Sequence, residues 1–332
     1  MSSPLLEPRV AVVGATTWGT ALAIILARKG LPVSLLARTD PEAQRLQADR
    51  RNARFLPSTP FPESLTVAAD PGEALPSADL VIIAAPSHSV RDNIRSVRES
   101  LTPGVVIVSA GQRFGIARWQ ADEPGYGGDG ICAMSGPNFA DEIVQGKFAS
   151  TVVAGRDSQL VNRAQEILMT GAFRVYTSDD LTGVELGGAL KNIIALGAGI
   201  ADGLEMGDNG KAAFITRGLA EIARLGVAAG AQALTFAGLA GLGDVIATCA
   251  SRLSRNRYVG EQLTMGRSWP EIREAMNNVA EGVNTTDAAL AMARELGVEM
   301  PITEATYRVL FEDLSPHDAV NQLMERPPRS EW

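Results

Sequence analysis

Cysteine, histidine and aromatic residues are scarce in this chain, and each scarcity excludes a class of site. Only two of its 332 residues are cysteines, two are histidines and 5% are aromatic. Two histidines, His88 and His317, are too few for a metal cluster, so no metal site is expected. Cys132 lies in an apolar run, Cys249 lies in a helix-like stretch, and no CxxC pattern occurs. We therefore expect free, buried thiols in a reducing compartment.

Basic residues and long apolar runs are also in short supply. Acidic residues outnumber basic ones by 38 to 30, which gives a net charge of −8. Such a field repels nucleic acid and anionic membranes, so neither is expected as a partner, and an anionic ligand needs a local basic site. No apolar stretch of membrane-spanning length is evident, and residues 1–8 lack the pattern of a signal peptide. These absences predict a cytoplasmic protein.

What remains is an ordinary globular composition in a chain long enough for two domains. Two patterns follow one another and change near residue 180. Before it, short β-branched runs alternate with helical stretches, and after it Ala, Leu and Gly recur at helical spacing. The sequence predicts an α/β protein, with an N-terminal Rossmann-type, mostly parallel sheet in residues 1–180 and an all-helical domain in residues 181–332. The expected strands are Val10 to Val13, Val33 to Leu36, Leu80 to Ala84, Val105 to Val108, Ile131 to Met134 and Thr151 to Val153.

One segment fits neither pattern. Residues 111–130 contain four glycines besides the two at their ends and no regular hydrophobic period. They predict a long loop, which is uncommon within a compact domain unless it has a function.

A glycine-rich turn follows the first expected strand. Gly14 and Gly19 match the first and third glycines of GxGxxG, the fingerprint of a dinucleotide-binding turn, while Thr16 takes the second position. A β-branched side chain there is expected to crowd the pyrophosphate, and a structural glycine turn is the alternative. Arg38 follows the second strand and favours NADP, because arginine accommodates a 2′-phosphate; a solvated surface arginine is the alternative. His88, after the third strand, is either an acid–base group or, more commonly, a cap or surface residue.

Several later motifs carry polar side chains suited to chemistry. Lys191 lies in a helix whose neighbours Gly187 and Ala195 leave little side-chain bulk, so a ligand can approach its ammonium, and burial there favours the neutral amine. A lysine that reaches to water from a buried helix is the alternative. Asp244 follows a glycine-rich turn, where its carboxylate can orient the lysine or receive a substrate hydroxyl; a helix N-cap is the alternative, and the two roles are compatible. Residues 254–257 have the sequence Ser-Arg-Asn-Arg, whose donors suit a phosphate dianion; a charged surface loop is the alternative.

These motifs together resemble bacterial NAD(P)-dependent glycerol-3-phosphate dehydrogenase. The similarity extends from about residue 10 to residue 323, and its motifs occur in one order: Arg54 to Pro57, Ser135 to Glu142, Leu186 to Ala195, Gly238 to Asp244, Ser254 to Arg257 and Glu281 to Thr286. The resemblance implies reduction of dihydroxyacetone phosphate, a phosphorylated triose, to sn-glycerol 3-phosphate with NAD(P)H, for glycerophospholipid synthesis. It implies that Lys191 transfers the proton and that Asp244 orients it.

The resemblance also assigns the binding residues. The substrate is implied to contact Lys191 and Asp244, with the remaining contacts from Gly136, Asn138, Ser254, Arg255 and Asn256. The cofactor is implied to contact Gly14, Thr17, Trp18, Gly19, Arg38, Ala140, Arg255, Val279 and Glu281. A homodimer formed through the helical domain is a further expectation.

The chain departs from the family pattern after the strand that ends at Val108. A family lysine that contacts substrate and cofactor is replaced there by Ala110. Arg113 is a hypothetical substitute for it. Ala110 and Thr16 leave open an alternative, a homologue that binds nucleotide or phosphate with impaired catalysis. A different 2-keto acid or β-hydroxyacid substrate is a third possibility, against which the phosphate-binding residues argue.

Overall fold

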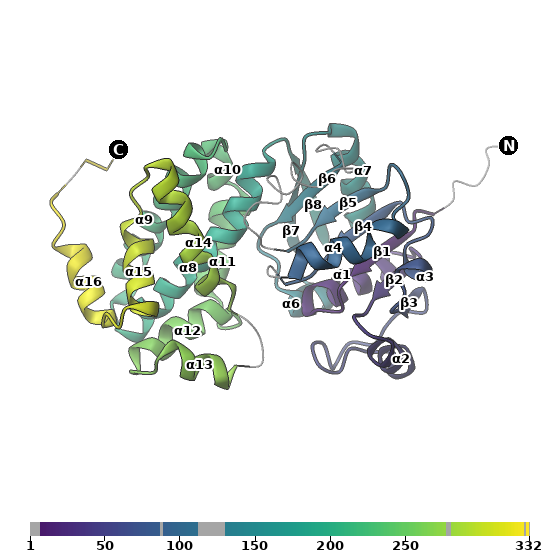
Figure 1. The fold of residues 1–332 in the computed structure, drawn as a ribbon, viewed down its shortest axis with the longest axis horizontal. Helices are drawn as coiled ribbons and strands as arrows, with labels where there is room; N and C mark the ends of the chain where they lie inside the picture. The colour runs from purple at the N-terminus through teal and green to yellow at the C-terminus, as the bar shows by residue number, and fades with distance from the viewer. Residues whose placement is uncertain (1–6, 87–88, 112–129, 277–279, 329, 332) are drawn as a thin grey trace. The chain divides into compact units, whose positions relative to one another are not determined.

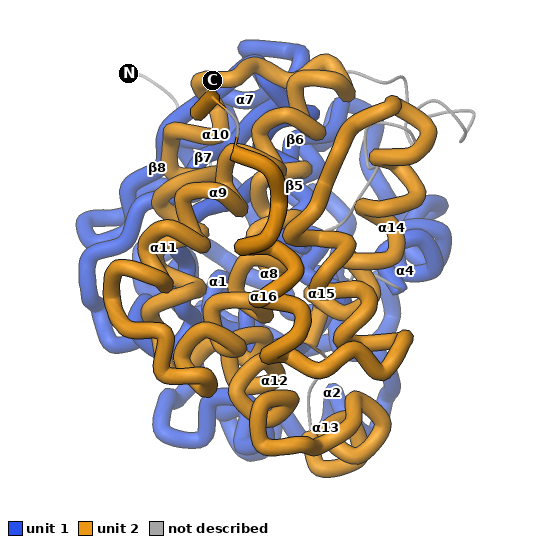
Figure 2. Tube along the Cα trace, turned by 90° about the vertical axis from the view of Figure 1, so that its left-hand side faces the viewer, with its two compact units in different colours: residues 1–185 blue, residues 186–332 orange. Residues whose placement is uncertain are grey.

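The computed structural model describes residues 7–86, 89–111, 130–276, 280–328 and 330–331. The chain divides into two compact units, residues 1–185 and residues 186–332, which are coloured separately in Figure 2. The expected loop at residues 111–130 and the positions of His88, Arg113 and Val279 lie wholly or almost wholly outside the described residues.

The first unit contains an eight-stranded sheet (Figure 1). Its strand order is β3-β2-β1-β4-β5-β6-β7-β8, and every neighbouring pair is parallel except β6 and β7, which are antiparallel. This confirms the expected Rossmann-type, mostly parallel sheet. The strands are β1 (Val10–Val13), β2 (Val33–Leu36), β3 (Leu65–Ala68), β4 (Leu80–Ile83), β5 (Val106–Ser109), β6 (Ile131–Ser135), β7 (Ala149–Ala154) and β8 (Phe173–Ser178).

The six expected strands are all present, and two more were missed. Both missed strands, β3 and β8, lie at the edges of the sheet. Along β8 buried and exposed residues alternate at first, and in β3 only Leu65 is fully buried. An edge strand is less covered than a central one, so it lacks the continuous apolar run by which the central strands were recognised.

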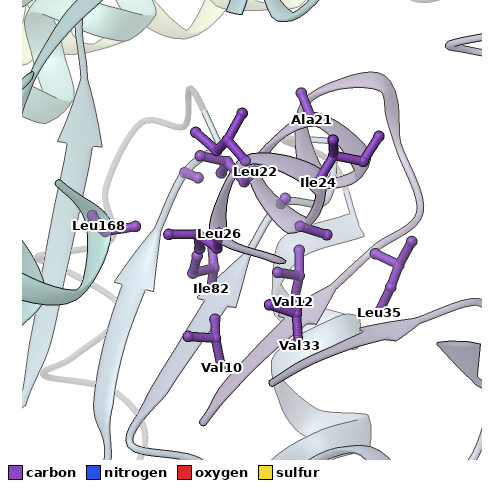
Figure 3. Close-up of a cluster of buried hydrophobic side chains, with 14 of the residues drawn as sticks. Val10, Val12, Ala21, Leu22, Ile24, Leu26, Val33, Leu35, Ile82 and Leu168 are labelled. Atoms are coloured by element: carbon purple, nitrogen blue, oxygen red, sulfur yellow. The ribbon is translucent and has the colours of Figure 1, made fainter. Parts of the chain in front are cut away.

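Helices cover both faces of the sheet because successive strand residues point to opposite sides. Val10 and Val12 belong to one buried cluster together with α1 (Thr17–Arg28), α2 (Asp40–Asp49), α6 (Ala140–Val144) and α7 (Ser158–Leu168). Figure 3 shows side chains of α1 above those of β1, β2 and β4 in this cluster. Ala11 and Val13 belong to the other cluster, with α3 (Pro71–Ala74) and α4 (Val90–Val97). A 3₁₀ turn, η2, follows at Arg98–Ser100.

The described part of the second unit is helical and contains no strand, as the helical spacing predicts. Its elements are α8 (Leu181–Gly203), which begins in the first unit, α9 (Gly207–Ala228), α10 (Ala233–Ala237), the π-helical turn η3 (Leu239–Gly243), α11 (Asp244–Ala250), α12 (Arg255–Thr264), α13 (Trp269–Ala275), α14 (Glu281–Leu296), α15 (Pro301–Phe311) and α16 (Pro316–Met324).

Helix α8 corrects the expectation that no segment has membrane-spanning length. It contains 23 residues and reaches a mean hydropathy of 1.3, so by length and composition alone it could cross a bilayer. Its most apolar window is entirely buried inside the structure. A helix that is apolar on all sides and surrounded by other helices is typical of a core helix. Leu196 and Ile200 accordingly pack into a buried cluster with α12, α13, α14, α15 and α16.

Candidate active site

The glycine turn lies between β1 and the first turn of α1. Gly14 has a φ of +109°, and a Cβ atom added there would lie 2.9 Å from the Ala84 carbonyl oxygen. A Cβ on Gly19 would lie 2.1 Å from the Gly14 carbonyl oxygen. Only glycine fits at either position, because the strand and the helix approach each other this closely. The first and third glycines of the fingerprint therefore have the structural roles that a dinucleotide turn requires.

Thr16 replaces the second glycine and is the N-cap of α1. Its hydroxyl accepts a hydrogen bond of 3.1 Å from the Gly19 N–H and donates one of 2.8 Å to the Ala84 carbonyl. The side chain thus joins the start of α1 to the end of β4. Backbone N–H groups at the start of a helix suit an anion, and the positive end of the helix dipole adds to this. One of these N–H groups, on Gly19, is occupied by Thr16.

The other cofactor candidates of the first unit occupy different elements. Thr17 and Trp18 are the first two residues of α1, and the Trp18 ring meets the Phe173 ring edge-on at 6.3 Å between centroids. Arg38 is exposed directly beyond β2, with its backbone N–H bonded to Glu42. Ala140 is the first residue of α6 and is half-buried.

Asn52 supports the glycine turn and was not singled out in the sequence. Its side chain is 3% exposed, and its amide nitrogen donates to the Ala15 carbonyl at 3.1 Å and to the Thr20 hydroxyl at 2.9 Å. Both acceptors flank the nucleotide turn, so Asn52 fixes its shape from a loop about 30 residues away in sequence. No local pattern around Asn52 indicates this contact.

Two substrate candidates follow β6. A Cβ on Gly136 would lie 3.0 Å from the Ser150 carbonyl oxygen, so the chain passes close to β7 there. The Asn138 amide nitrogen donates to the Thr151 hydroxyl at 2.9 Å, and that hydroxyl donates to the Ser135 carbonyl. The Asn138 Oδ1 atom is buried without a hydrogen-bond partner among the described residues. An acceptor left unpaired in this way is available to a ligand donor.

The centre of the second unit is a buried ion pair between Lys191 of α8 and Asp244 of α11. The Lys191 Nζ donates to the Asp244 Oδ1, and the two residues are 5% and 1% exposed. Asp244 also accepts a 3.3 Å hydrogen bond from the Thr248 hydroxyl one turn later. Asp244 therefore gives the buried Lys191 ammonium a charged partner. Asp244 is the first residue of α11 and Gly243 is the cap residue, so the N-cap interpretation of Asp244 is wrong.

The glycines near Lys191 have a role that differs from the expected one. A Cβ on Gly187 would lie 2.5 Å from the Ala240 carbonyl oxygen. The space beside α8 is therefore filled by the backbone of η3, the turn that leads into Asp244. Within η3 the Gly243 N–H bonds to the Gly238 carbonyl at 3.1 Å, and a Cβ on Gly241 would collide with Phe236. These glycines allow η3 to approach α8 and place Asp244 beside Lys191.

A chain of side-chain amides connects three of the motifs. The Asn256 Nδ2 donates to the Asn192 Oδ1 at 2.7 Å, and the Asn256 Oδ1 accepts from the Gly282 N–H at 2.9 Å. Asn192 follows Lys191 on α8, and Gly282 follows Glu281 on α14. A Cβ on Gly282 would lie 2.7 Å from the Asn192 carbonyl oxygen, so this crossing also requires glycine. One N–H of the Asn256 amide is left for another acceptor.

The remaining phosphate candidates lie at the start of α12. Ser254 is its N-cap, is 5% exposed, and accepts a 3.3 Å hydrogen bond from the Arg257 N–H. Arg255 is on the first turn, where desolvation lowers the pKa of its guanidinium and the nearby Glu281 carboxylate acts in the opposite direction. The structure thus brings together Lys191, Asp244, Asn192, Asn256 and Glu281 with their neighbours within one unit. The motif is a helix start, and the alternative of a charged surface loop does not describe it.

Ala110 and the two cysteines are all buried. Ala110 is 6% exposed, packs in the cluster that contains Val10, and donates its N–H to the Ile83 carbonyl.

Cys132 and Cys249 are free, as expected, and burial raises the pKa of each thiol to about 12. They are therefore poor nucleophiles at neutral pH. Among the described residues no group of three or more His, Cys, Asp or Glu side chains could hold a metal ion.

Comparison with known families tests the resemblance that these motifs indicate. Residues 9–161 match the profile of the NAD-dependent glycerol-3-phosphate dehydrogenase N-terminus, and residues 180–321 match that of the C-terminus. The chain belongs to the NAD-dependent glycerol-3-phosphate dehydrogenase family. The resemblance inferred from the motifs is thereby confirmed.

Individual relatives of this family are similar over nearly the whole chain. A glycerol-3-phosphate dehydrogenase [NAD(P)+] of Dehalococcoides mccartyi is 50% identical and covers 95% of this chain and 90% of its own length. The glycerol-3-phosphate dehydrogenase [NAD(P)+] of Chlorobium limicola is 44% identical and covers 97% of this chain and 99% of its own length. The crystal structure of glycerol-3-phosphate dehydrogenase from Coxiella burnetii has a TM-score of 0.89 and is 36% identical in sequence. The match covers 96% of this chain and 99% of that chain. The alternative of a catalytically impaired homologue gains no support from these relatives.

Proposed function

We propose that this chain is an oxidoreductase that reduces dihydroxyacetone phosphate to sn-glycerol 3-phosphate with NAD(P)H, and that the product supplies glycerophospholipid synthesis. Its similarity to glycerol-3-phosphate dehydrogenases over nearly its whole length supports the reaction. The buried Lys191–Asp244 pair supports the chemistry. This pair is the observation that carries the proposal, because a ketone reduction needs a proton donor beside the developing alkoxide.

Lys191 is the proposed proton donor. The hydride is supplied by the nicotinamide of NAD(P)H when it is bound. The Lys191 ammonium lies in a site that excludes water, where a charged donor stabilises an alkoxide better than it does in solution. Asp244 holds the ammonium in place, and Thr248 holds Asp244. The ketone oxygen would accept the Lys191 proton as negative charge develops on it.

The start of α12 is the proposed phosphate site. Ser254 and Asn256 are buried and held in fixed positions, and each keeps a donor free of the contacts that position it. Arg255 can bind a phosphate through two parallel N–H donors. The N-terminus of α12 adds the positive end of its dipole. Gly136 and Asn138 are proposed to line the remainder of the substrate.

The turn after β1 fits a dinucleotide, because it has glycine at both positions, Gly14 and Gly19, where a Cβ atom would collide with the backbone. Gly14, Thr17, Trp18 and Gly19 would hold the pyrophosphate side, and Arg38 would favour NADP through the 2′-phosphate. The remaining proposed cofactor contacts are Ala140, Arg255, Val279 and Glu281. We further propose a cytoplasmic location and a homodimer formed through the helical unit; light scattering of the purified chain tests the dimer.

The reaction is tested by following oxidation of NADPH, and separately of NADH, with dihydroxyacetone phosphate. We expect turnover, and we expect the product to be the sn-3 enantiomer when it is assayed with a stereospecific enzyme. Dihydroxyacetone without phosphate is the matched control, and its kcat/KM should be lower by at least about 100-fold, because it lacks the charge-assisted contacts of the phosphate. Equal turnover of the two ketones would contradict the phosphate site, and no turnover of either would contradict the proposed reaction.

A further inference from the structure

A second group of ion pairs lies on α8, three turns beyond Lys191, and the proposed reaction does not use it. The Asp202 Oδ2 accepts from the Arg257 Nε at 2.6 Å and from the Lys211 Nζ at 2.7 Å. The Arg257 side chain is only 14% exposed and also pairs with Glu261 at 2.8 Å. Burial raises the pKa of the Asp202 carboxyl, but the hydrogen bonds from Lys211 and Arg257 outweigh it and lower that pKa below its usual value. Asp202 is therefore charged at neutral pH.

The Asp202–Arg257 bond joins two helices whose backbones touch. A Cβ on Gly199 of α8 would lie 2.0 Å from the Arg257 carbonyl oxygen of α12. In the opposite direction, a Cβ on Gly260 of α12 would lie 2.0 Å from the Leu196 carbonyl oxygen of α8. Such contact fixes the spacing of the helices, since glycine is the only residue that permits it. Asp202 and Arg257 add a directional bond at the same crossing.

Helix α12 presents the phosphate candidates in the residues immediately before Arg257. Its first turn is held to α8 at two places, by Asn256 on Asn192 and by Arg257 on Asp202. Lys191 is on α8 as well, so the spacing between the phosphate candidates and the proton donor is set by one pair of helices. A group that fixes α12 against α8 therefore fixes where a bound phosphate lies relative to Lys191.

We propose that Asp202 is a positioning residue for the substrate phosphate, acting through Arg257 to hold the first turn of α12 in register with Lys191. This inference rests on the proposed reduction of dihydroxyacetone phosphate. Asp202 touches neither the reacting atoms nor the phosphate, and its effect reaches them through α12. Substitution of Asp202 therefore changes the affinity for the phosphate-bearing substrate more than it changes the chemical step.

The test compares Asp202→Asn with the matched control Glu261→Gln. Both variants remove one carboxylate charge from Arg257, but Glu261 lies on α12 itself, so only Asp202→Asn removes an ion pair between helices. The measurements are kcat and KM for dihydroxyacetone phosphate, the inhibition constant of inorganic phosphate as a competitor, and the thermal midpoint. Wild-type turnover is measured first, because its absence would refute the proposed reaction whatever the variants do.

For Asp202→Asn we expect KM and the phosphate inhibition constant to rise together, on the order of 10-fold, with kcat within about 3-fold of wild type. Glu261→Gln should change each by less than about 2-fold. Two results would overturn the inference in a wild type that is active: a KM unchanged by Asp202→Asn, or a fall in kcat with no change in the phosphate inhibition constant.

If Asp202→Asn does not fold, Asp202→Glu decides by the same constants. The longer carboxylate keeps the charge and shifts the position of Arg257, so KM should still rise with kcat retained. A KM equal to that of wild type in a folded Asp202→Glu variant would overturn the inference.

Discussion

Breaking the Lys191–Asp244 pair from one side should destabilise the protein more than removing it entirely. Both groups are at least 94% buried as side chains, so Asp244→Asn leaves an ammonium in the interior without its carboxylate. Loss of one partner of a buried pair costs about 3–5 kcal/mol, whereas replacement of both by neutral groups is often nearly neutral. Lys191→Met should cost a comparable amount, because it removes the ammonium that pairs with the buried Asp244 carboxylate.

The assay is a double-mutant cycle read by calorimetric thermal midpoints. At about 2–4 °C per kcal/mol for a domain of this size, a loss of about 3 kcal/mol lowers the midpoint by roughly 6–12 °C. The Lys191→Met/Asp244→Asn double variant should recover at least about 2 kcal/mol relative to the sum of the single variants. The exposed Arg308–Glu312 pair gives the control, and Glu312→Gln should cost less than about 1 kcal/mol. If the losses of stability in the two single variants simply add in the double variant, the two buried charges do not stabilise each other and the argument is refuted.

Three further outcomes follow from single contacts. Thr16→Val should lower stability by about 1 kcal/mol, because it removes the cap on Gly19 and the bond to Ala84, while Thr16→Ser keeps both; thermal midpoints of the two variants distinguish this from a loss of bulk. Burial raises the pKa of the Glu221 carboxyl, so the stability that its protonated form contributes is present below pH 4.5 and is lost as pH rises through the pKa of the folded state. Thermal midpoints measured upward from pH 4.5 should show this decline in the wild type and not in Glu221→Gln. Arg38→Glu should raise the KM for NADPH by about 10-fold or more and leave the KM for NADH nearly unchanged, and equal effects on both would contradict a 2′-phosphate contact.

The architecture of the sheet was predictable because central strands carry their own signal. Val10–Val13 and Leu80–Ile83 are short β-branched runs buried on both faces, and the sequence alone marks them. The edge strands β3 and β8 lack such runs, and the pattern of strands does not reveal that β6 and β7 pair in the antiparallel direction. Local hydrophobicity thus predicts which residues form strands better than it predicts how strands pair.

The site was predictable as a set of residue types but not as a set of contacts. Lys191 and Asp244 stood out in the sequence because polar residues among glycine and alanine are unusual, yet nothing local shows that Gly187 admits the backbone of η3. Asn52 was missed for the same reason, because its two acceptors lie in a turn distant in sequence. Contacts between segments more than 30 residues apart depend on the tertiary fold and leave no periodic pattern.

The proton-donor role of Lys191 is tested most directly by the Lys191→Met variant, assayed for turnover of dihydroxyacetone phosphate and for NADPH binding by titration. Lys191 is proposed to act on the ketone and not to hold the cofactor, so kcat should fall by about 100- to 10,000-fold while the dissociation constant of NADPH stays within about 2-fold of wild type. The variant must be assayed below its lowered thermal midpoint. Turnover within about 10-fold of wild type in the folded variant would contradict the assignment of Lys191 as the proton donor.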